Sequence, residues 1–200
     1  MISKDQILTA LQEDIFKKIM DTSFELDIKS FVVGGFVRDY LLNRKIVKDI
    51  DILCIGSGID FAINVQKSID KSKKINIYKR FGTAMIKWKD YTIEFVGARK
   101  ESYSKDTRKP KVKPGSFIDD MNRRDFTINT LAISLNKENY GELIDTFNGI
   151  DDLKNGIIKT PTDPDKTFSD DPLRILRAVR FSSQLKYDIE ENTYKSIEVN

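Results

Sequence analysis

The runs FVVGGFVRD at residues 31–39 and DIDILCI at residues 49–55 decide the fold and the chemistry of this chain. Successive side chains of a strand point to opposite faces, so a strand over residues 49–55 places Asp49 and Asp51 on one face. Two neighbouring carboxylates repel each other unless a cation lies between them, and Mg²⁺ is bound by one or two carboxylates together with substrate phosphates. The spacing therefore predicts a Mg²⁺ site at these two aspartates.

A double glycine, Gly34-Gly35, precedes this strand and predicts a tight turn between a strand at residues 31–34 and a helix. Glycine leaves the backbone N–H groups accessible, and the start of a helix favours a bound phosphate. We expect Arg38 to fold back onto that phosphate, because its planar guanidinium matches the oxygens, and Asp39 to fix the local geometry. A metal site beside a phosphate cradle indicates chemistry on a nucleoside triphosphate.

A predicted strand over residues 91–97 carries Glu94 between two apolar neighbours. If this strand lies beside residues 49–55, Glu94 becomes a third carboxylate of the catalytic site; the alternative is an exposed strand glutamate. The mechanism expected for such a site is two-metal phosphoryl transfer. One ion would activate the attacking hydroxyl, and the other would hold the triphosphate and the leaving oxygen.

Composition limits the remaining possibilities. The 200 residues allow one domain, or one domain and part of another. The chain has no histidine and one cysteine, Cys54, which excludes Ser-His-Asp and Cys-His catalysis and zinc sites built from these residues. A single cysteine forms no internal disulfide, and no apolar run is long enough to span a membrane. We therefore expect a cytoplasmic protein whose catalytic groups are carboxylates, Lys, Arg and hydroxyls.

Other elements are predicted from periodicity and turn residues. Helical spacing predicts one or two helices over residues 4–27 and one over 59–70, and strand patterns cover 75–79 and 83–88. Positive charge concentrates in residues 99–113, which hold seven Lys or Arg and two Asp or Glu. Because this segment is followed or interrupted by Pro110, Pro114 and Gly115, we expect residues 99–115 to form an irregular, mobile loop.

The second half is predicted to begin with a short helix at residues 116–124. Residues 125–135 are expected to form a longer helix or a helix followed by a strand, and residues 140–160 to form short strands with tight turns. Arg123 and Arg124 would stand at a helix start, where the helix dipole opposes them, so a bound anion is expected there. Asn129 is expected to be a buried hydrogen-bonding residue.

A further helix is predicted from about Pro172 to Leu185, capped by Ser169 or Asp170. Arg174, Arg177 and Arg180 recur every three residues and would line one side together with Asp171, whereas Ile175, Ala178 and Val179 would face the core. One interpretation is a solvated basic face. The other is base recognition, because an Asp acceptor and an Arg donor complement the amino group and acceptor nitrogen of cytosine or adenine. Such a pair would accept CTP and ATP and reject UTP and GTP.

Six motifs in order resemble class II CCA-adding tRNA nucleotidyltransferases and bacterial poly(A) polymerases of the polymerase-β-like nucleotidyltransferase superfamily. They are GGFVRD (34–39), DID (49–51), IEFVGAR (93–99), RRDFTIN (123–129), NGIDDLKNGIIKTP (148–161) and DDPLRILRAVRF (170–181). The resemblance implies an α+β fold, with a head built on a mixed sheet flanked by helices and followed by the start of an all-helical neck. The implied boundaries are N-terminal helices at 1–27, the catalytic head at 28–147, and the head–neck connection with the truncated neck at 148–200.

The resemblance also implies roles for individual residues. Asp49 and Asp51 would bind Mg²⁺, with the triphosphate contacted by Gly34, Gly35, Arg38 and Arg124. Asp171 and Arg174 would read the incoming base, and Arg177 and Arg180 would help to hold nucleotide or primer. Family members often have Glu where this chain has Asp170, and they continue past residue 200 with regions that grip tRNA, so we expect an N-terminal fragment.

The implied activity is template-independent addition of C, C and A to the 3′ end of tRNA from CTP and ATP, with release of pyrophosphate. The same motifs also serve poly(A) polymerases and A-only or CC-only adding enzymes, which stay open as alternatives. A third possibility is a non-catalytic RNA-binding module that uses residues 99–113 and the arginine helix for phosphate contacts.

Overall fold

The computed structural model describes residues 3–44, 48–70, 72, 74–104 and 107–200. By their internal contacts they divide into two compact units. The boundaries that the resemblance implies, at residues 27 and 147, stay a prediction. The N-terminal unit comprises residues 1–98 and 132–144, and the second unit comprises residues 99–131 and 145–200. Within the described ranges, every helix is too short or too polar to cross a lipid bilayer.

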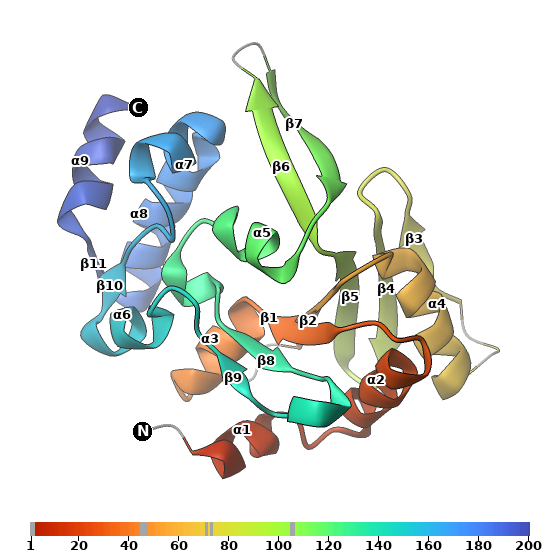
Figure 1. Ribbon diagram of the computed structural model, residues 1–200. Coiled ribbons are helices and arrows are strands. Elements are labelled where there is room, and N and C mark those ends of the chain that lie inside the picture. Colours follow the sequence, from red (N-terminus) through yellow and green to blue (C-terminus); the bar gives the residue numbers. More distant parts are fainter. Residues whose placement is uncertain (1–2, 45–47, 71, 73, 105–106) are drawn as a thin grey trace. The chain divides into compact units, whose positions relative to one another are not determined.

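The N-terminal unit is built on a seven-stranded sheet with the order β3-β4-β5-β2-β1-β8-β9 (Figure 1). Its strands are β1 (Ser30–Val33), β2 (Asp49–Cys54), β3 (Asn76–Tyr78), β4 (Thr83–Trp88), β5 (Tyr91–Gly97), β8 (Ala132–Ser134) and β9 (Leu143–Ile144). The β2–β5 pair is parallel and the other pairs in this sheet are antiparallel. This confirms the predicted mixed sheet and α+β class.

Helices accompany this sheet as the periodicity predicted. They are α1 (Lys4–Ala10), α2 (Asp14–Glu25), α3 (Gly35–Leu41) and α4 (Gly58–Ile69), with a 3₁₀ turn at Lys137–Asn139. Helix α4 covers one face of the sheet, where the ring of Phe61 packs edge-on against Phe95 with a centroid distance of 5.5 Å. Burying one such side chain stabilises a fold by about 1.5–3 kcal/mol, so this face forms the core.

A close backbone contact fixes the start of α4 against β5. A Cβ atom added to Gly97 would lie 2.3 Å from the carbonyl oxygen of Gly56, well inside van der Waals contact. Any larger residue at Gly97 would therefore push the β2–α4 connection away from the sheet.

The second unit contains the remaining elements. They are β6 (Arg99–Ser104), β7 (Thr107–Pro114), α5 (Phe117–Asn122), a 3₁₀ turn at Thr127–Asn129, α6 (Gly149–Asn155), β10 (Ile157–Ile158), α7 (Pro164–Asp170), α8 (Leu173–Leu185), β11 (Asp188–Ile189) and α9 (Glu191–Val199). Strands β10 and β11 form a short parallel pair. The rings of Phe126 and Phe181 meet edge-on at 5.9 Å and belong to the core of this unit.

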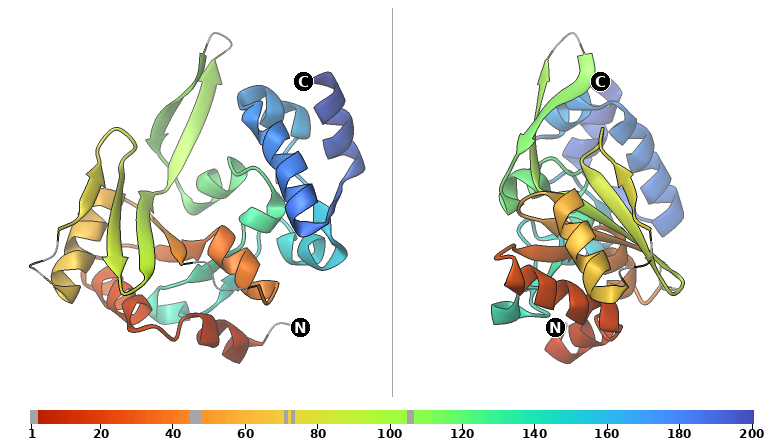
Figure 2. Two further views of the ribbon diagram at one scale, coloured as in Figure 1. Left: turned by 180° about the vertical axis from the view of Figure 1, so that it is seen from behind. Right: turned by 90° about the vertical axis from the view of Figure 1, so that its right-hand side faces the viewer.

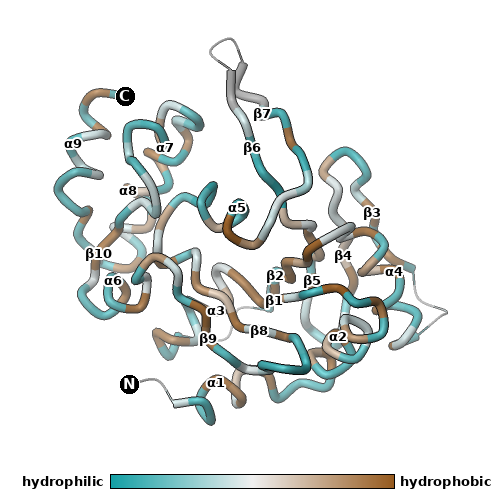
Figure 3. Tube along the Cα trace, viewed as in Figure 1, coloured by the Kyte–Doolittle hydropathy of each residue, from teal (hydrophilic) through white to brown (hydrophobic). Residues whose placement is uncertain are grey.

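The predicted loop over residues 99–115 is wrong, because the described part of this segment forms the antiparallel hairpin β6–β7 (Figures 1 and 2). Proline is excluded from the interior of a sheet but is tolerated at a bulge or a strand end. Pro110 falls where the hairpin register shifts, and Pro114 is the last residue of β7. Figure 3 shows that the coloured part of the hairpin is mainly hydrophilic, whereas hydrophobic residues gather on β1, β2 and β8.

Two helices were missed by the sequence analysis. Helix α6 lies within the region predicted to form short strands and tight turns. Helix α7 begins at Pro164, directly after Asp163, whose side chain accepts a hydrogen bond from the Lys166 N–H. Proline in the first turn after a capping aspartate is a helix start rather than a break. Of the two alternatives for residues 125–135, the structure favours a helix followed by a strand, with a 3₁₀ turn at Thr127–Asn129 before β8.

Candidate active site

Strand β2 presents the two predicted metal ligands on one exposed face. Asp49 and Asp51 are exposed, whereas Ile50 between them is 1% exposed on the opposite, buried face. In the parallel pair β2–β5, Asp51 is in register with Glu94, and residues in register across a ladder share a face. The structure therefore brings Asp49, Asp51 and Glu94 to the same face of the sheet.

This arrangement suits a metal that completes its shell with substrate. Among the residues that the structure describes, no three Asp, Glu, His or Cys side chains gather closely enough to hold a metal by themselves. Mg²⁺ rarely needs such a cage, because it keeps several waters and binds one or two carboxylates plus phosphates. The exposed Asp49 and Asp51 pair fits Mg²⁺ on these terms, whereas a third ligand role for Glu94 stays a prediction.

The double-glycine turn lies beside this acidic face. Strand β1 pairs with β2 so that Val33, its last residue, is opposite Asp51, and Gly34 follows directly. Gly34 has φ 73° and ψ −134°, a backbone conformation that residues with a Cβ rarely adopt. The glycine is therefore required to turn the chain into α3 next to the two aspartates.

Arg38 and Asp39 form a buried pair on α3. Both residues are 7% exposed, and the Arg38 guanidinium donates two parallel hydrogen bonds to Asp39, from Nε at 3.0 Å and from Nη2 at 2.9 Å. The expectation that Asp39 fixes local geometry is thus met by a direct contact, which orients the planar guanidinium. Binding of a phosphate by Arg38 stays a prediction.

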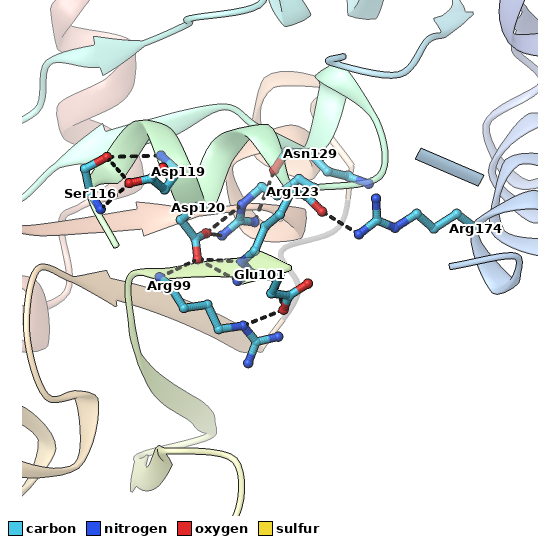
Figure 4. A network of polar contacts seen from close by, with 9 residues as sticks. Arg99, Glu101, Ser116, Asp119, Asp120, Arg123, Asn129 and Arg174 are labelled. Carbon is cyan, nitrogen blue, oxygen red and sulfur yellow. Dashed lines mark hydrogen bonds and ion pairs between the residues drawn. The ribbon is translucent and has the colours of Figure 1, made fainter. Parts of the chain in front are cut away.

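In the second unit, one buried carboxylate holds two consecutive arginines (Figure 4). The Asp120 side chain is fully buried. Its Oδ1 accepts hydrogen bonds from Nε and Nη2 of Arg123 at 2.9 and 2.6 Å, and its Oδ2 accepts from Nε and Nη2 of Arg124 at 3.3 and 3.1 Å. A carboxylate that accepts this many bonds fixes both guanidinium planes.

The position of these arginines corrects the sequence prediction. Helix α5 ends at Asn122 and Arg123 is its C-cap, so both arginines follow a helix rather than start one. Positive charge is favourable at a helix C-terminus, and Asp120 supplies the counter-charge that was expected from a bound anion. Asn129 is buried as predicted, and its Nδ2 donates to Asp125 Oδ1 at 2.9 Å.

The base of the β6–β7 hairpin joins this cluster through Glu101. The Glu101 side chain is 4% exposed, and its Oε1 lies 3.6 Å from Arg123 Nη1 and 2.8 Å from Arg99 Nε. The side-chain Nε–H of Arg99 makes no well-aligned hydrogen bond to this oxygen, so the contact between Arg99 and Glu101 is an ion pair. The arginine network hereafter denotes Arg99, Glu101, Asp120, Arg123, Arg124 and Arg174.

Helix α8 contributes Arg174 to this network, and its buried face overlaps the predicted one at Ala178 but not at Val179. Arg174 is 8% exposed, and its Nη2 donates to the backbone oxygen of Arg123 at 2.7 Å. Arg174 therefore shares the buried stripe with Ala178 and Phe181, whereas Val179, predicted to face the core, is 55% exposed. Residues 174, 178 and 181 lie on the same face of a helix, because they are separated by four and three residues. With Arg174 buried, this face is buried and Val179 is exposed.

The other two arginines of α8 are more exposed. Arg177 donates from Nε to Asp125 Oδ2 at 2.6 Å, and 43% of its side chain is exposed. The Arg180 guanidinium carbon lies 5.1 Å from the centroid of the Phe181 ring, a cation–π distance. The predicted single basic face thus separates into one buried arginine, one ion-paired arginine and one stacked arginine.

The two predicted base-reading residues line one cavity of the second unit. This cavity has a volume of about 480 Å³, and its lining includes Asp171, Arg174, Arg123 and Glu101. A second cavity of about 750 Å³ is lined in part by Asp170 and by the same three network residues, Glu101, Arg123 and Arg174. Burial raises the pKa of Asp170 above its ordinary value. The structure therefore brings Asp171 and Arg174 together, as the sequence analysis predicted.

Asp120 and Glu101 belong to the arginine network but were not among the residues predicted from the sequence. Asp120 precedes Arg124 by four residues in a predicted helix, and an acid and a base at that spacing face each other, so this signal was available. Glu101 gave no comparable signal, because its partner Arg123 lies on a different element.

Known proteins resemble this chain in sequence. A family model described as the poly A polymerase head domain matches residues 30–159. The A-adding tRNA nucleotidyltransferase of Aquifex aeolicus (strain VF5) is 41% identical over 172 residues, which cover 84% of this chain and 20% of that protein. The CCA-adding enzyme of Lactobacillus helveticus (strain DPC 4571) is 38% identical over 192 residues, covering 94% of this chain and 45% of that protein.

A solved structure also resembles this chain. A tRNA nucleotidyltransferase complexed with a primer tRNA and an incoming ATP analog matches with a TM-score of 0.77 and 35% identity, over 90% of this chain and 49% of that one. The chain spans less than half the length of each of these relatives.

Proposed function

This chain belongs to the poly A polymerase head-domain family, and from that premise we propose that it carries the catalytic head and first neck helices of a tRNA nucleotidyltransferase. The proposed reaction extends the 3′ end of tRNA without a template, using CTP and ATP in the cytosol. The terminal 3′ hydroxyl loses its proton and attacks the α-phosphate, the bond between the α-phosphorus and the bridging oxygen breaks, and pyrophosphate leaves.

One observation carries this proposal. Asp49 and Asp51 occupy the exposed face of β2, in register with Glu94 and beside the Gly34 turn. Two exposed acids on one strand face bring two negative charges close together, an arrangement that suits a bound cation. Bound Mg²⁺ would supply neutralisation of the triphosphate charge and a lowered pKa for the attacking hydroxyl.

The chain's own residues would then divide the work. Asp49 and Asp51 hold the metal, with Glu94 as a further carboxylate on their face. The backbone at Gly34 and Gly35, together with Arg38, binds phosphate oxygens. A contact of Arg124 with the triphosphate is what the family resemblance implies.

Base selection is assigned to Asp171 and Arg174. A guanidinium has five N–H donors, so Arg174 can keep its bond to the Arg123 carbonyl and still donate to an acceptor nitrogen of the base. Asp171 would accept the exocyclic amino group of cytosine or adenine. Uracil and guanine present a carbonyl at that position, which the carboxylate repels. Arg177 and Arg180 would support the nucleotide or the primer.

An A-adding enzyme is the second candidate, because the Aquifex relative bears that name while the Lactobacillus relative is CCA-adding. Two transcripts separate the candidates: a tRNA that lacks CCA and a tRNA that ends in CC. A CCA-adding enzyme extends both when CTP and ATP are present. An A-adding enzyme extends only the second, and a poly(A) polymerase produces long tails from ATP alone.

The catalytic assignment is tested with Asp49→Asn and Asp51→Asn in the same incorporation assay. Loss of a metal-binding carboxylate should lower the rate by at least about 100-fold, since even outer-shell partners of a metal contribute 10- to 100-fold. Asp60→Asn is the matched control, because Asp60 is exposed on α4, which covers the opposite face of the sheet. Retained turnover in either β2 variant would overturn the assignment of Asp49 and Asp51 as the metal-binding carboxylates.

A further inference from the structure

An exposed basic and aromatic surface lies at one edge of the N-terminal sheet. Residues 71–89 hold seven Lys or Arg and no acidic residue, whereas two acidic residues accompany the seven Lys or Arg of residues 99–113. Within this segment every residue of edge strand β3 is exposed. Tyr78 is 42% exposed and Phe81 is 65% exposed, although large aromatic side chains normally contribute to a core.

The β3–β4 hairpin ends in a defined backbone turn, and Figure 2 shows the course of this hairpin. The Phe81 N–H donates to the Tyr78 carbonyl at 2.9 Å, and the Gly82 N–H donates to the Lys79 carbonyl at 3.3 Å. Gly82 has φ 67°, as the residue closing such a turn requires. The Arg80 guanidinium carbon lies 6.0 Å from the Phe81 ring centroid, so a cation and an aromatic face are presented together.

Strand register connects this surface with the acidic face. Asp49 is in register with Thr92 of β5, and Thr92 is in register with Lys87 of β4, so Lys87 shares the face of the aspartates. Tyr78 reaches the same face through its pairing with Thr83. Strand β3 is three strand spacings from β2, or about 14 Å.

Protection of the sheet edge explains only part of this composition. Lysines on an edge strand discourage association with another strand, which accounts for positive charge but not for exposed aromatic rings. Basic side chains together with exposed rings instead match single-stranded nucleic acid, whose phosphates pair with Lys and Arg and whose bases stack on aromatic faces. A duplex hides its base faces and would use only the charges.

We propose that Tyr78, Lys79, Arg80, Phe81 and Lys87 form a docking surface for single-stranded RNA, the β3–β4 patch. The inference rests on the proposed function, because its role is to lead a single-stranded RNA end toward Asp49 and Asp51. Stacking on Phe81 and Tyr78 supplies affinity without base preference, and Lys79, Arg80 and Lys87 follow the backbone.

Binding of a fluorescein-labelled single-stranded RNA, measured by anisotropy in EDTA without nucleotide, tests this surface independently of catalysis. Phe81→Ala should weaken binding about 5- to 150-fold, the effect of losing one stacked base, and Phe81→Tyr should restore it. Replacing Lys79 and Arg80 by Ala should reduce the slope of log affinity against log salt concentration by about 1.4, or about 0.7 per phosphate contact.

Phe24→Ala is the matched control within the same unit. Phe24 is 58% exposed and also lies against a cation, with Lys137 Nζ 4.1 Å from its ring centroid. Equal weakening by Phe24→Ala and Phe81→Ala, unchanged binding in Phe81→Ala, or equal affinity for duplex RNA would each overturn the proposal. In the incorporation assay, Phe81→Ala should raise KM for the RNA and leave KM for CTP unchanged.

The two proposals fail in different ways. If the wild-type chain binds single-stranded RNA through Phe81 but incorporates no nucleotide, the β3–β4 patch stands and the proposed function is wrong. If incorporation proceeds and Phe81→Ala leaves KM for the RNA unchanged, the proposed function stands and the patch is wrong.

Discussion

The two units use carboxylates in opposite ways. In the N-terminal unit, Asp49 and Asp51 are exposed, one residue apart on the same face of β2. In the second unit, Asp120 and Asp125 are buried and each binds at least one arginine. A buried acid bonded to guanidinium groups is held by the fold, whereas an exposed acid is accessible to an incoming ligand. The contrast teaches that burial, rather than residue type, separates a structural carboxylate from a candidate catalytic one.

Asp120→Asn should produce the largest change in stability. Removing the charge leaves two guanidinium groups partly buried without their carboxylate, and breaking a buried pair costs about 3–5 kcal/mol. Urea unfolding measures this loss. Asp151→Asn is the control, because Asp151 is 72% exposed beside Lys154 and such a surface pair contributes about 0–1 kcal/mol. Similar free energies of unfolding for the two variants would contradict the structural role given to Asp120.

Binding of Mg²⁺ and CTP at Asp49 and Asp51 should stabilise the folded chain. Mg²⁺ with CTP at a hundred times its dissociation constant should raise the free energy of unfolding by about 2.7 kcal/mol, since it binds the folded state alone. EDTA should remove this gain, and Asp49→Asn or Asp51→Asn should never show it, although neither change weakens the fold itself. A calorimetric scan with and without ligand measures the effect. An equal gain in the Asp51→Asn variant would show that the metal lies elsewhere.

Cys54 tests the buried face of the same strand. Burial raises the pKa of the Cys54 thiol from 9.0 to about 12. The folded chain therefore keeps this proton between pH 9 and pH 12 while the unfolded chain loses it, so stability falls as pH rises through that window. At pH 10 the wild type should lose about 1.4 kcal/mol relative to pH 8, a loss absent from Cys54→Ala. Equal pH dependence in the two proteins would contradict burial of the thiol.

Local patterns were sufficient to predict the N-terminal unit. Alternation along residues 49–54 separates Asp49 and Asp51 from Ile50 and Ile52, and this alternation is a property of the strand alone. The double glycine marks the turn because no other residue adopts the backbone angles of Gly34 readily. The neighbourhood of Glu94 was also predictable in outline, since it needed only the pairing of two recognised strands.

The second unit was predicted less well because long-range contacts decide its details. Arg174 is buried because its guanidinium reaches the Arg123 carbonyl 51 residues earlier, which no helical pattern encodes. A loop was predicted in place of the β6–β7 hairpin because proline disfavours the interior of a strand. The register shift of the hairpin accommodates Pro110. Helix α7 was not predicted, although Pro164 follows the capping residue Asp163 and occupies the first turn of the helix.

The arginine network has a consequence that extends beyond folding. It joins four guanidinium groups to only two carboxylates, so the cluster as a whole is cationic even though each acid is satisfied. Folding therefore brings the excess positive charge of these guanidinium groups together before any polyanion binds. The electrostatic work of gathering them is then completed during folding, and an arriving phosphate meets an attraction that requires no rearrangement.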